Sequence, residues 1–221
     1  MGCGDAAAPF DDPVRLTVSA RRISIFPLPG AVLYPGLQLP LHIFEPRYRA
    51  MVSDALARDR RIGMIQPQRP YEGAPLFEIG CLGRIGEVEA LEDGRYNIVL
   101  EGESRFRIIR ELEVSTLFRQ VEAELIEEPD PDQLAAIERA ACERASRRFA
   151  DAQGYRVDWD SVGRLDDVSL INGVSQIAPF DPASKQALLE AKNLSARCEL
   201  LIQLMQFFGR SDGEEEIQTL Q

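Results

Sequence analysis

The fold is decided by residues 22–44, which read RISIFPLPGAVLYPGLQLPLHIF. Residues 22–26 alternate polar and apolar side chains as a β-strand does, and the prolines and glycine of residues 27–30 then turn the chain. Residues 37–44 are extended again, but Pro40 has no amide hydrogen and confines this strand to an edge or a bulge. The stretch therefore predicts two strands, joined by an apolar connection, in a sheet with an open edge.

The chain downstream of this stretch predicts more strands and one helix. Glu45-Pro46 opens a helix with proline at a tolerated early position. Asp93-Gly94 is a strong hairpin signal, because both residues accept a positive φ. Gly102 marks a further turn or bulge. The expected strands cover residues 62–65, 79–91, 96–100, 106–109 and 118–126. Together they predict a compact barrel or pseudo-barrel of about six strands with one covering helix.

The composition changes at residues 127–131, and the rest of the chain has helical periodicity. Asp130 is an expected N-cap and Pro131 an expected first helical residue. Asp181-Pro182 repeats that signal, and Asn193 is an expected cap for the last helix. The apolar stripe of the first long helix consists of Leu134, Ile137, Ala141, Ala145 and Phe149.

These patterns place the protein in the α+β class and divide it into four segments. A disordered lead is expected at 1–20 and an acidic tail at 210–221. The β subdomain is expected at 21–127, and the helical subdomain, a C-terminal bundle, at 128–209.

Composition excludes several classes of function. The net charge of −11 opposes affinity for nucleic acid or an anionic membrane. The chain has two lysines, neither preceded by glycine, so it contains no phosphate-binding G-x-x-x-x-G-K-[ST] loop. One histidine and four scattered cysteines provide no readable metal or redox motif. We therefore expect neither cofactor nor metal.

The chain also has no apolar run of membrane-spanning length and no secretory leader, which favours the cytoplasm.

Few residues of the chain indicate a catalytic function. His42 is the only imidazole, and it lies in an apolar strand without a G-x-S-x-G nucleophile motif. A structural histidine is the simpler interpretation, although a hydrolase based on His42 stays open. The basic clusters Arg58-Asp59-Arg60-Arg61 and Arg105-Phe106-Arg107 are expected to be solvated surface, with nucleic-acid contact as the alternative.

The aromatic and apolar residues of the N-terminal stretch are the best candidates for a binding site. Prolines that interrupt strand pairing leave edges and grooves, and one chain captures an extended peptide from another at such places. His42 and Glu45 are candidate polar anchors. The full candidate set is Phe26, Leu28, Tyr34, His42, Phe44, Glu45 and Tyr48.

The sequence also resembles a known family, the N-terminal, substrate-binding domain of Lon proteases, from about Arg22 to Phe208. The resemblance implies a PUA-like pseudo-barrel followed by a helical bundle. It gives no counterpart for the ATPase and Ser-Lys protease modules of full-length Lon, and no catalytic residue of the family maps onto this chain. The resemblance lies in residues 25–36, 39–48, 79–85, 93–96, 102–108, 179–182 and 185–190.

From the residues and this resemblance we expect a non-enzymatic protein that binds unfolded or degron-like polypeptide segments, with a protease or chaperone in trans as a further partner. RNA binding is the alternative, because the PUA-like fold is well known from RNA-modifying proteins, but function belongs to a site rather than to a fold.

Overall fold

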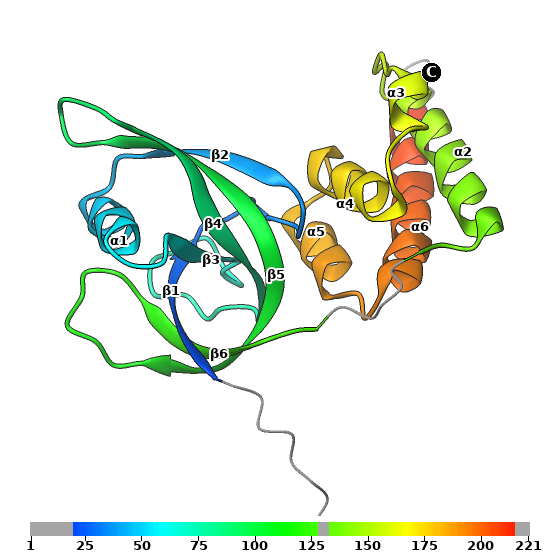
Figure 1. The fold of residues 1–221 in the computed structure, drawn as a ribbon. Coiled ribbons are helices and arrows are strands. Elements are labelled where there is room, and N and C mark those ends of the chain that lie inside the picture. The colour runs from blue at the N-terminus through cyan, green and yellow to red at the C-terminus, as the bar shows by residue number, and fades with distance from the viewer. Residues whose placement is uncertain (1–19, 128–132, 215–221) are drawn as a thin grey trace, which may run out of the picture.

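A computed structural model describes residues 20–127 and 133–214, with side chains described as far as residue 209 (Figure 1). The expected cap at Asp130-Pro131 and nearly all of the expected N-terminal lead lie outside these residues. The last helix extends to Glu214, so its backbone continues into the segment expected to be an acidic tail.

The strands form a closed barrel. Their order is β2-β5-β4-β3-β1-β6, and β6 also pairs with β5, which closes the ring and leaves β2 attached outside it. β1 and β3 are parallel, and the other pairs are antiparallel. The strands are β1 (Arg21–Pro27), β2 (Gln38–Ile43), β3 (Arg61–Ile65), β4 (Ile79–Ala90), β5 (Tyr96–Leu112) and β6 (Gln120–Leu125).

Helix α1 (Pro46–Leu56) covers the barrel on the side away from the other helices (Figure 1). Proline occupies its first turn, where no amide donor is needed. Its buried residues Tyr48, Met51, Val52 and Ala55 belong to the barrel core. The barrel and its covering helix thus follow the sequence prediction.

The separate strand predicted at residues 106–109 is wrong. β5 runs unbroken from Tyr96 to Leu112 and pairs with β2, β4 and β6 along its length. Gly102 marks a bulge, where the register against β4 shifts between Leu82 and Gly83. A bulge bends a strand without ending it, so one long strand curves around the barrel.

The helical part contains α2 (Ala136–Ala152), α3 (Trp159–Val162), α4 (Asp167–Ile177), α5 (Pro182–Glu190) and α6 (Leu194–Glu214). The two predicted caps are confirmed. Asp181 Oδ1 accepts from the amides of Ala183 and Ser184, and Asn193 Oδ1 accepts from that of Ala196. Sequence analysis did not predict α3.

The expected stripe of α2 is only partly correct. Ile137 is 76% exposed, whereas Cys142 and Ser146 are buried alongside Ala145 and Phe149. The buried face of α2, which packs against α6, therefore lies partly to one side of the predicted stripe.

Residues 32–34 join the barrel to the helices. Val32 and Tyr34 belong to the core of the helical part, whereas Leu33 between them belongs to the core of the barrel. The Tyr34 hydroxyl donates to the carbonyl of Lys185 at 2.8 Å, and Asn172 Nδ2 donates to the carbonyl of Pro35 at 3.0 Å. Apolar contacts and hydrogen bonds therefore hold the two parts together along this segment.

Two buried arginines satisfy carbonyls at the end of α5. Arg105 of β5 is 2% exposed and donates through Nη1 to the carbonyls of Leu189 and Ala191, at 2.7 and 2.6 Å. Arg197 of α6 donates through Nε to the carbonyl of Leu188 at 2.8 Å. A cation near the last carbonyls of a helix also interacts favourably with the helix dipole.

We predict that Arg105→Met lowers the free energy of unfolding by about 3 kcal/mol, because it leaves two carbonyls without their charged donor. Urea denaturation followed by circular dichroism measures the change. Arg107→Met, two residues along the same strand, is the control. Its ion pair with Glu124 is solvent-exposed, so it costs less than about 1 kcal/mol. Equal losses in the two variants would contradict the interface role of Arg105.

We predict a second loss of stability for Gly102→Ala. The amide of Gly36 donates to the carbonyl of Gly102 at 2.9 Å, and a Cβ at Gly102 would lie 2.1 Å from the carbonyl oxygen of Tyr34. Relief of that clash moves the segment that joins the two parts, at a cost of about 2 kcal/mol or more. Gly173→Ala in α4 is the matched control. Its Cβ meets nothing within 4 Å, and alanine favours the helix by about 1 kcal/mol. The same urea titration measures the expected loss of stability in Gly102→Ala and the expected gain in Gly173→Ala.

Candidate functional site

The seven candidate residues do not form one site. Phe26 is 4% exposed in the barrel core, and Tyr34 is fully buried in the helical core. Their burial removes these two from any contact surface, because their apolar rings stabilise the fold by leaving water. Tyr48 is also buried, at 7% exposed, but unlike Phe26 and Tyr34 it lines a cleft on the barrel. Tyr48 and the remaining four residues divide between two separate places.

His42 and Phe44 lie on and next to β2, the strand outside the ring. Asn97 Oδ1 lies 2.7 Å from His42 Nδ1, and Arg95 Nη1 lies 3.3 Å from His42 Nε2. An amide oxygen accepts and a guanidinium donates, so Nδ1 carries the proton and Nε2 accepts. The two hydrogen-bond partners thus include neither a carboxylate nor a nucleophile. His42 and Glu45 are not brought together, since Glu45 instead contacts Arg47 at 2.8 Å.

Leu28, Glu45 and Tyr48 lie at a cleft of about 740 Å³ on the barrel. Its walls are the turn after β1, the start of α1, the segment 67–73, the end of β5 and the connection 113–119 between β5 and β6. Two side chains of these walls are strongly exposed: Tyr71 at 58% and Leu117 at 70%. The cleft therefore offers unpartnered apolar surface between ordered walls.

Ion pairs hold the cleft walls. Arg47 at the start of α1 pairs with Glu45 and reaches across to Glu72. Arg119 donates to Glu111 at 2.6 and 2.7 Å, and its Nη1 donates to the carbonyl of Ala74 at 3.1 Å. Both arginines thus attach the 67–77 segment to the barrel.

The same contacts shift two titrations at the cleft. The hydrogen bond from Arg119 holds the pKa of Glu111 below its usual value. Burial raises the pKa of Tyr48, against the opposing charge of Arg47, whose guanidinium carbon lies 4.6 Å from the centre of the Tyr48 ring. At neutral pH the cleft therefore has a carboxylate at Glu111 and a neutral phenol at Tyr48.

Tyr71 and Leu117 were not predicted from the sequence. Both lie in connections, Tyr71 in a proline-rich segment and Leu117 between two strands, where periodicity carries no information. An aromatic residue among prolines, Pro70-Tyr71, was the one available signal.

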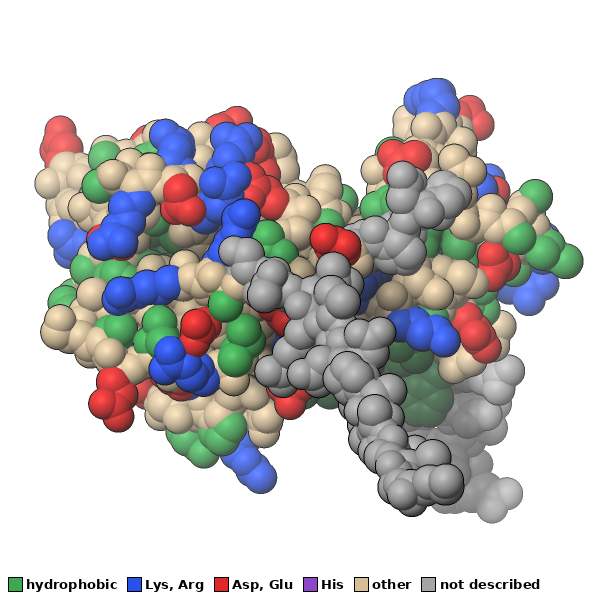
Figure 2. All heavy atoms as spheres, turned by 60° about the horizontal axis from the view of Figure 1, so that its bottom comes forward, with side chains coloured by type: hydrophobic (Ala, Val, Ile, Leu, Met, Phe, Trp, Pro, Cys, Tyr) green, Lys and Arg blue, Asp and Glu red, His purple; other side chains and the backbone are tan. Residues whose placement is uncertain are grey.

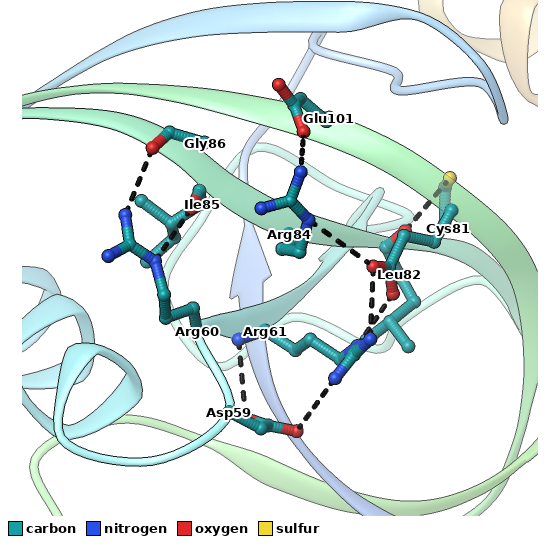
Figure 3. A network of polar contacts seen from close by, with 10 residues as sticks. Asp59, Arg60, Arg61, Cys81, Leu82, Arg84, Ile85, Gly86 and Glu101 are labelled. Carbon is teal, nitrogen blue, oxygen red and sulfur yellow. Dashed lines mark hydrogen bonds and ion pairs between the residues drawn. The ribbon is translucent and has the colours of Figure 1, made fainter.

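The first basic cluster, residues 58–61, is largely occupied by intramolecular contacts, several of which Figure 3 shows. The expectation that Arg105-Phe106-Arg107 is solvated surface is wrong for Arg105 and Phe106, which are 2% and 0% exposed. Arg60 adopts a left-handed φ of 60° and donates to the carbonyls of Ile85 and Gly86 at 2.9 and 3.0 Å. Arg61 contacts Glu103 at 2.6 Å, and Arg84 pairs with Glu101. Figure 2 shows basic, acidic and hydrophobic side chains interspersed over the face of the barrel that it turns forward. A continuous basic surface, which phosphate binding favours, is therefore not built from these clusters.

The described residues offer no candidate for a membrane-spanning helix or a metal site. No helix within residues 20–127 and 133–214 is long and apolar enough to cross a membrane. In the same residues, no three or more histidine, cysteine, aspartate or glutamate side chains gather as a metal ion would require.

Comparison with known proteins points to one family. The family model described as the ATP-dependent protease La (LON) substrate-binding domain matches residues 22–206. Lon protease 2 of Sorangium cellulosum is 27% identical over 89% of this chain, and Lon protease of Escherichia coli K12 is 25% identical over 90%. The chain spans about a quarter of their length, 26% and 25%.

Solved structures share the fold. A Lon N-terminal domain protein from Xanthomonas campestris aligns with a TM-score of 0.64 at 22% identity, over 83% of this chain and 98% of that one. The N-terminal domain of Lon protease from the Mycobacterium avium complex aligns with the same TM-score at 21% identity, over 84% and 98%. The α+β fold with a PUA-like barrel and a helical bundle is thereby confirmed.

We predict that Tyr34→Phe lowers the free energy of unfolding by about 1 kcal/mol at neutral pH, through loss of its bond to Lys185. Burial raises the pKa of Tyr34, so the folded state favours the neutral phenol. The stability gained from keeping the Tyr34 phenol neutral is fully present below the pKa of tyrosine in the unfolded chain, about 10. It is lost as the pH rises above that value. The variant should therefore lose less stability between neutral pH and strong alkali than the parent protein. Some loss remains because the pKa of Tyr48 is raised as well.

Urea denaturation at several pH values measures this difference. Tyr71→Phe is the control, because the Tyr71 side chain is 58% exposed and is not part of the core of the helical part. A parallel alkaline decline in the parent and Tyr34→Phe would contradict the prediction.

Proposed function

The chain belongs to the family of Lon substrate-binding domains, and we propose that it binds unfolded or degron-like polypeptide segments without catalysing a reaction on them. The observation that carries this proposal is the 740 Å³ cleft on the barrel with Tyr71 and Leu117 exposed at its walls. We place the contact site there, around Leu28, Glu45 and Tyr48 of the candidate set.

The chemistry of the cleft suits an unfolded chain. Exposed leucine and tyrosine side chains offer apolar area to the side chains that a folded protein would bury. Prolines at the cleft, Pro29 and Pro70 among them, lack amide donors and keep these connections from closing into strand pairs. Ion pairs on the walls keep the apolar surface open, which lowers the entropic cost of binding.

The partners and the compartment follow from the same proposal. We propose a cytoplasmic protein with a protease or chaperone in trans as a further partner, because the matching family is the substrate-binding domain of a protease. We propose no nucleic-acid or membrane partner. The net charge of −11 and the internal use of Arg60, Arg61 and Arg84 support that part of the proposal.

We predict that the double variant Tyr71→Ser with Leu117→Ser binds unfolded polypeptide about tenfold more weakly than the parent. Fluorescence anisotropy with labelled α-lactalbumin, reduced and blocked with neutral carboxamidomethyl groups, measures the affinity. The disulfide-intact form of the same protein is the folded competitor and should not bind.

Ile109→Ser is the matched control, because Ile109 is a 53% exposed side chain of β5 outside the cleft. Phe44→Ser tests the second surface. Loss of binding in Phe44→Ser alone would place the site on β2 and refute the cleft. Absence of binding by the parent, together with salt-sensitive retention of RNA in a filter assay, would replace the proposal with the RNA alternative.

A further inference from the structure

A second hollow of about 460 Å³ lies on the helical part, between α2 and α6. The two helices run parallel, because Glu138 contacts Ser195 near one end and Ser146 contacts Met205 further along. Apolar side chains form the floor of this groove: Ala145, Phe149, Ile202 and Met205. Figure 1 shows α2 and α6 at the opposite end of the molecule from α1 and the β5–β6 connection, whose residues line the cleft.

Two arginines line the α2 side of the groove. Arg144 and Arg148 are exposed, lie one helical turn apart and form no ion pair within the described part of the chain. Other arginines of α2 are engaged: Arg139 pairs with Glu143 and Asp167, and Arg147 lies 4.5 Å from the centre of the Trp159 ring. The groove therefore carries positive charge on a chain whose net charge is −11.

A helix fits this groove better than an extended segment does. The backbone groups of α2 and α6 are satisfied within their own helices, so they offer no ladder bonds to a strand. A helix brings its own backbone bonds and needs only an apolar face. Ala141 to Phe149 spans eight residue steps, or about 12 Å, which accommodates roughly two turns of a partner helix.

We propose that the α2–α6 groove binds an acidic amphipathic helix of a partner protein. Its apolar residues, at helical spacing, contact Phe149, Ile202 and Met205. Its carboxylates, four residues apart, pair with Arg144 and Arg148, whose spacing along α2 is the same. This surface is separate from the polypeptide cleft, and the proposal does not depend on the function proposed there.

A charge-swap experiment tests the proposal. The probe is a labelled peptide of about 15 residues with leucines at i, i+3, i+4 and i+7 and glutamates flanking them. A second peptide has lysine in place of each glutamate. Fluorescence anisotropy with the full chain should show binding of the glutamate peptide, weakened about tenfold in R144E/R148E. The lysine peptide should bind the double variant better than it binds the parent.

R147E is the control, since it changes the same charge on the same helix outside the groove and should leave binding unchanged. The substituted arginines are exposed, and circular dichroism checks that each variant keeps its fold. Equal weakening by R147E, or no gain for the lysine peptide with the double variant, would overturn the proposal. So would binding to phosphatidylglycerol vesicles, or self-association abolished by R144E/R148E, because either assigns the groove to another occupant.

Discussion

Residues 32–34 pack alternately into the barrel core and the helical core, and this packing sets how the two parts of the molecule are joined. Their side chains alternate in direction as in a strand, with Leu33 packed in the barrel and Val32 and Tyr34 among the helices. A shift of one residue would place all three in the wrong core. Just after this segment, the Gly36 amide donates to the carbonyl of Gly102, and the Gly102 amide donates to that of Leu37. These two bonds attach the chain to β5.

Hydrogen bonds of buried polar groups fix the position of the barrel relative to the helices at the same junction. Arg105 and Arg197 are each 2% exposed and use their donors on carbonyls of α5. Arg197 also donates to Asn172, whose own amide reaches the carbonyl of Pro35. Such groups are costly to bury and are satisfied in one arrangement only, so the barrel and the helices hold one relative position. The cleft and the α2–α6 groove consequently face apart.

The candidate site was predictable in part. Prolines in the N-terminal stretch predicted edges and grooves there, and Leu28, Glu45 and Tyr48 line a cleft. Their role in binding stays a prediction. Phe26 and Tyr34 carry the same apolar and aromatic character, but burial of large apolar side chains is the more common outcome, and both are buried. Tyr71 and Leu117 reach the cleft from connections distant in sequence, and no local pattern places two connections side by side.

The amino-acid sequence determined the elements: most strands and helices, the hairpin at Asp93-Gly94, the caps at Asp181 and Asn193, and the family. These features depend on the conformational preferences of neighbouring residues, which are local. The continuity of β5, the burial of Tyr34 and the walls of the cleft were decided only by tertiary structure. Each depends on contacts between segments far apart in the chain, as in the bond from Tyr34 to Lys185, which no local preference specifies.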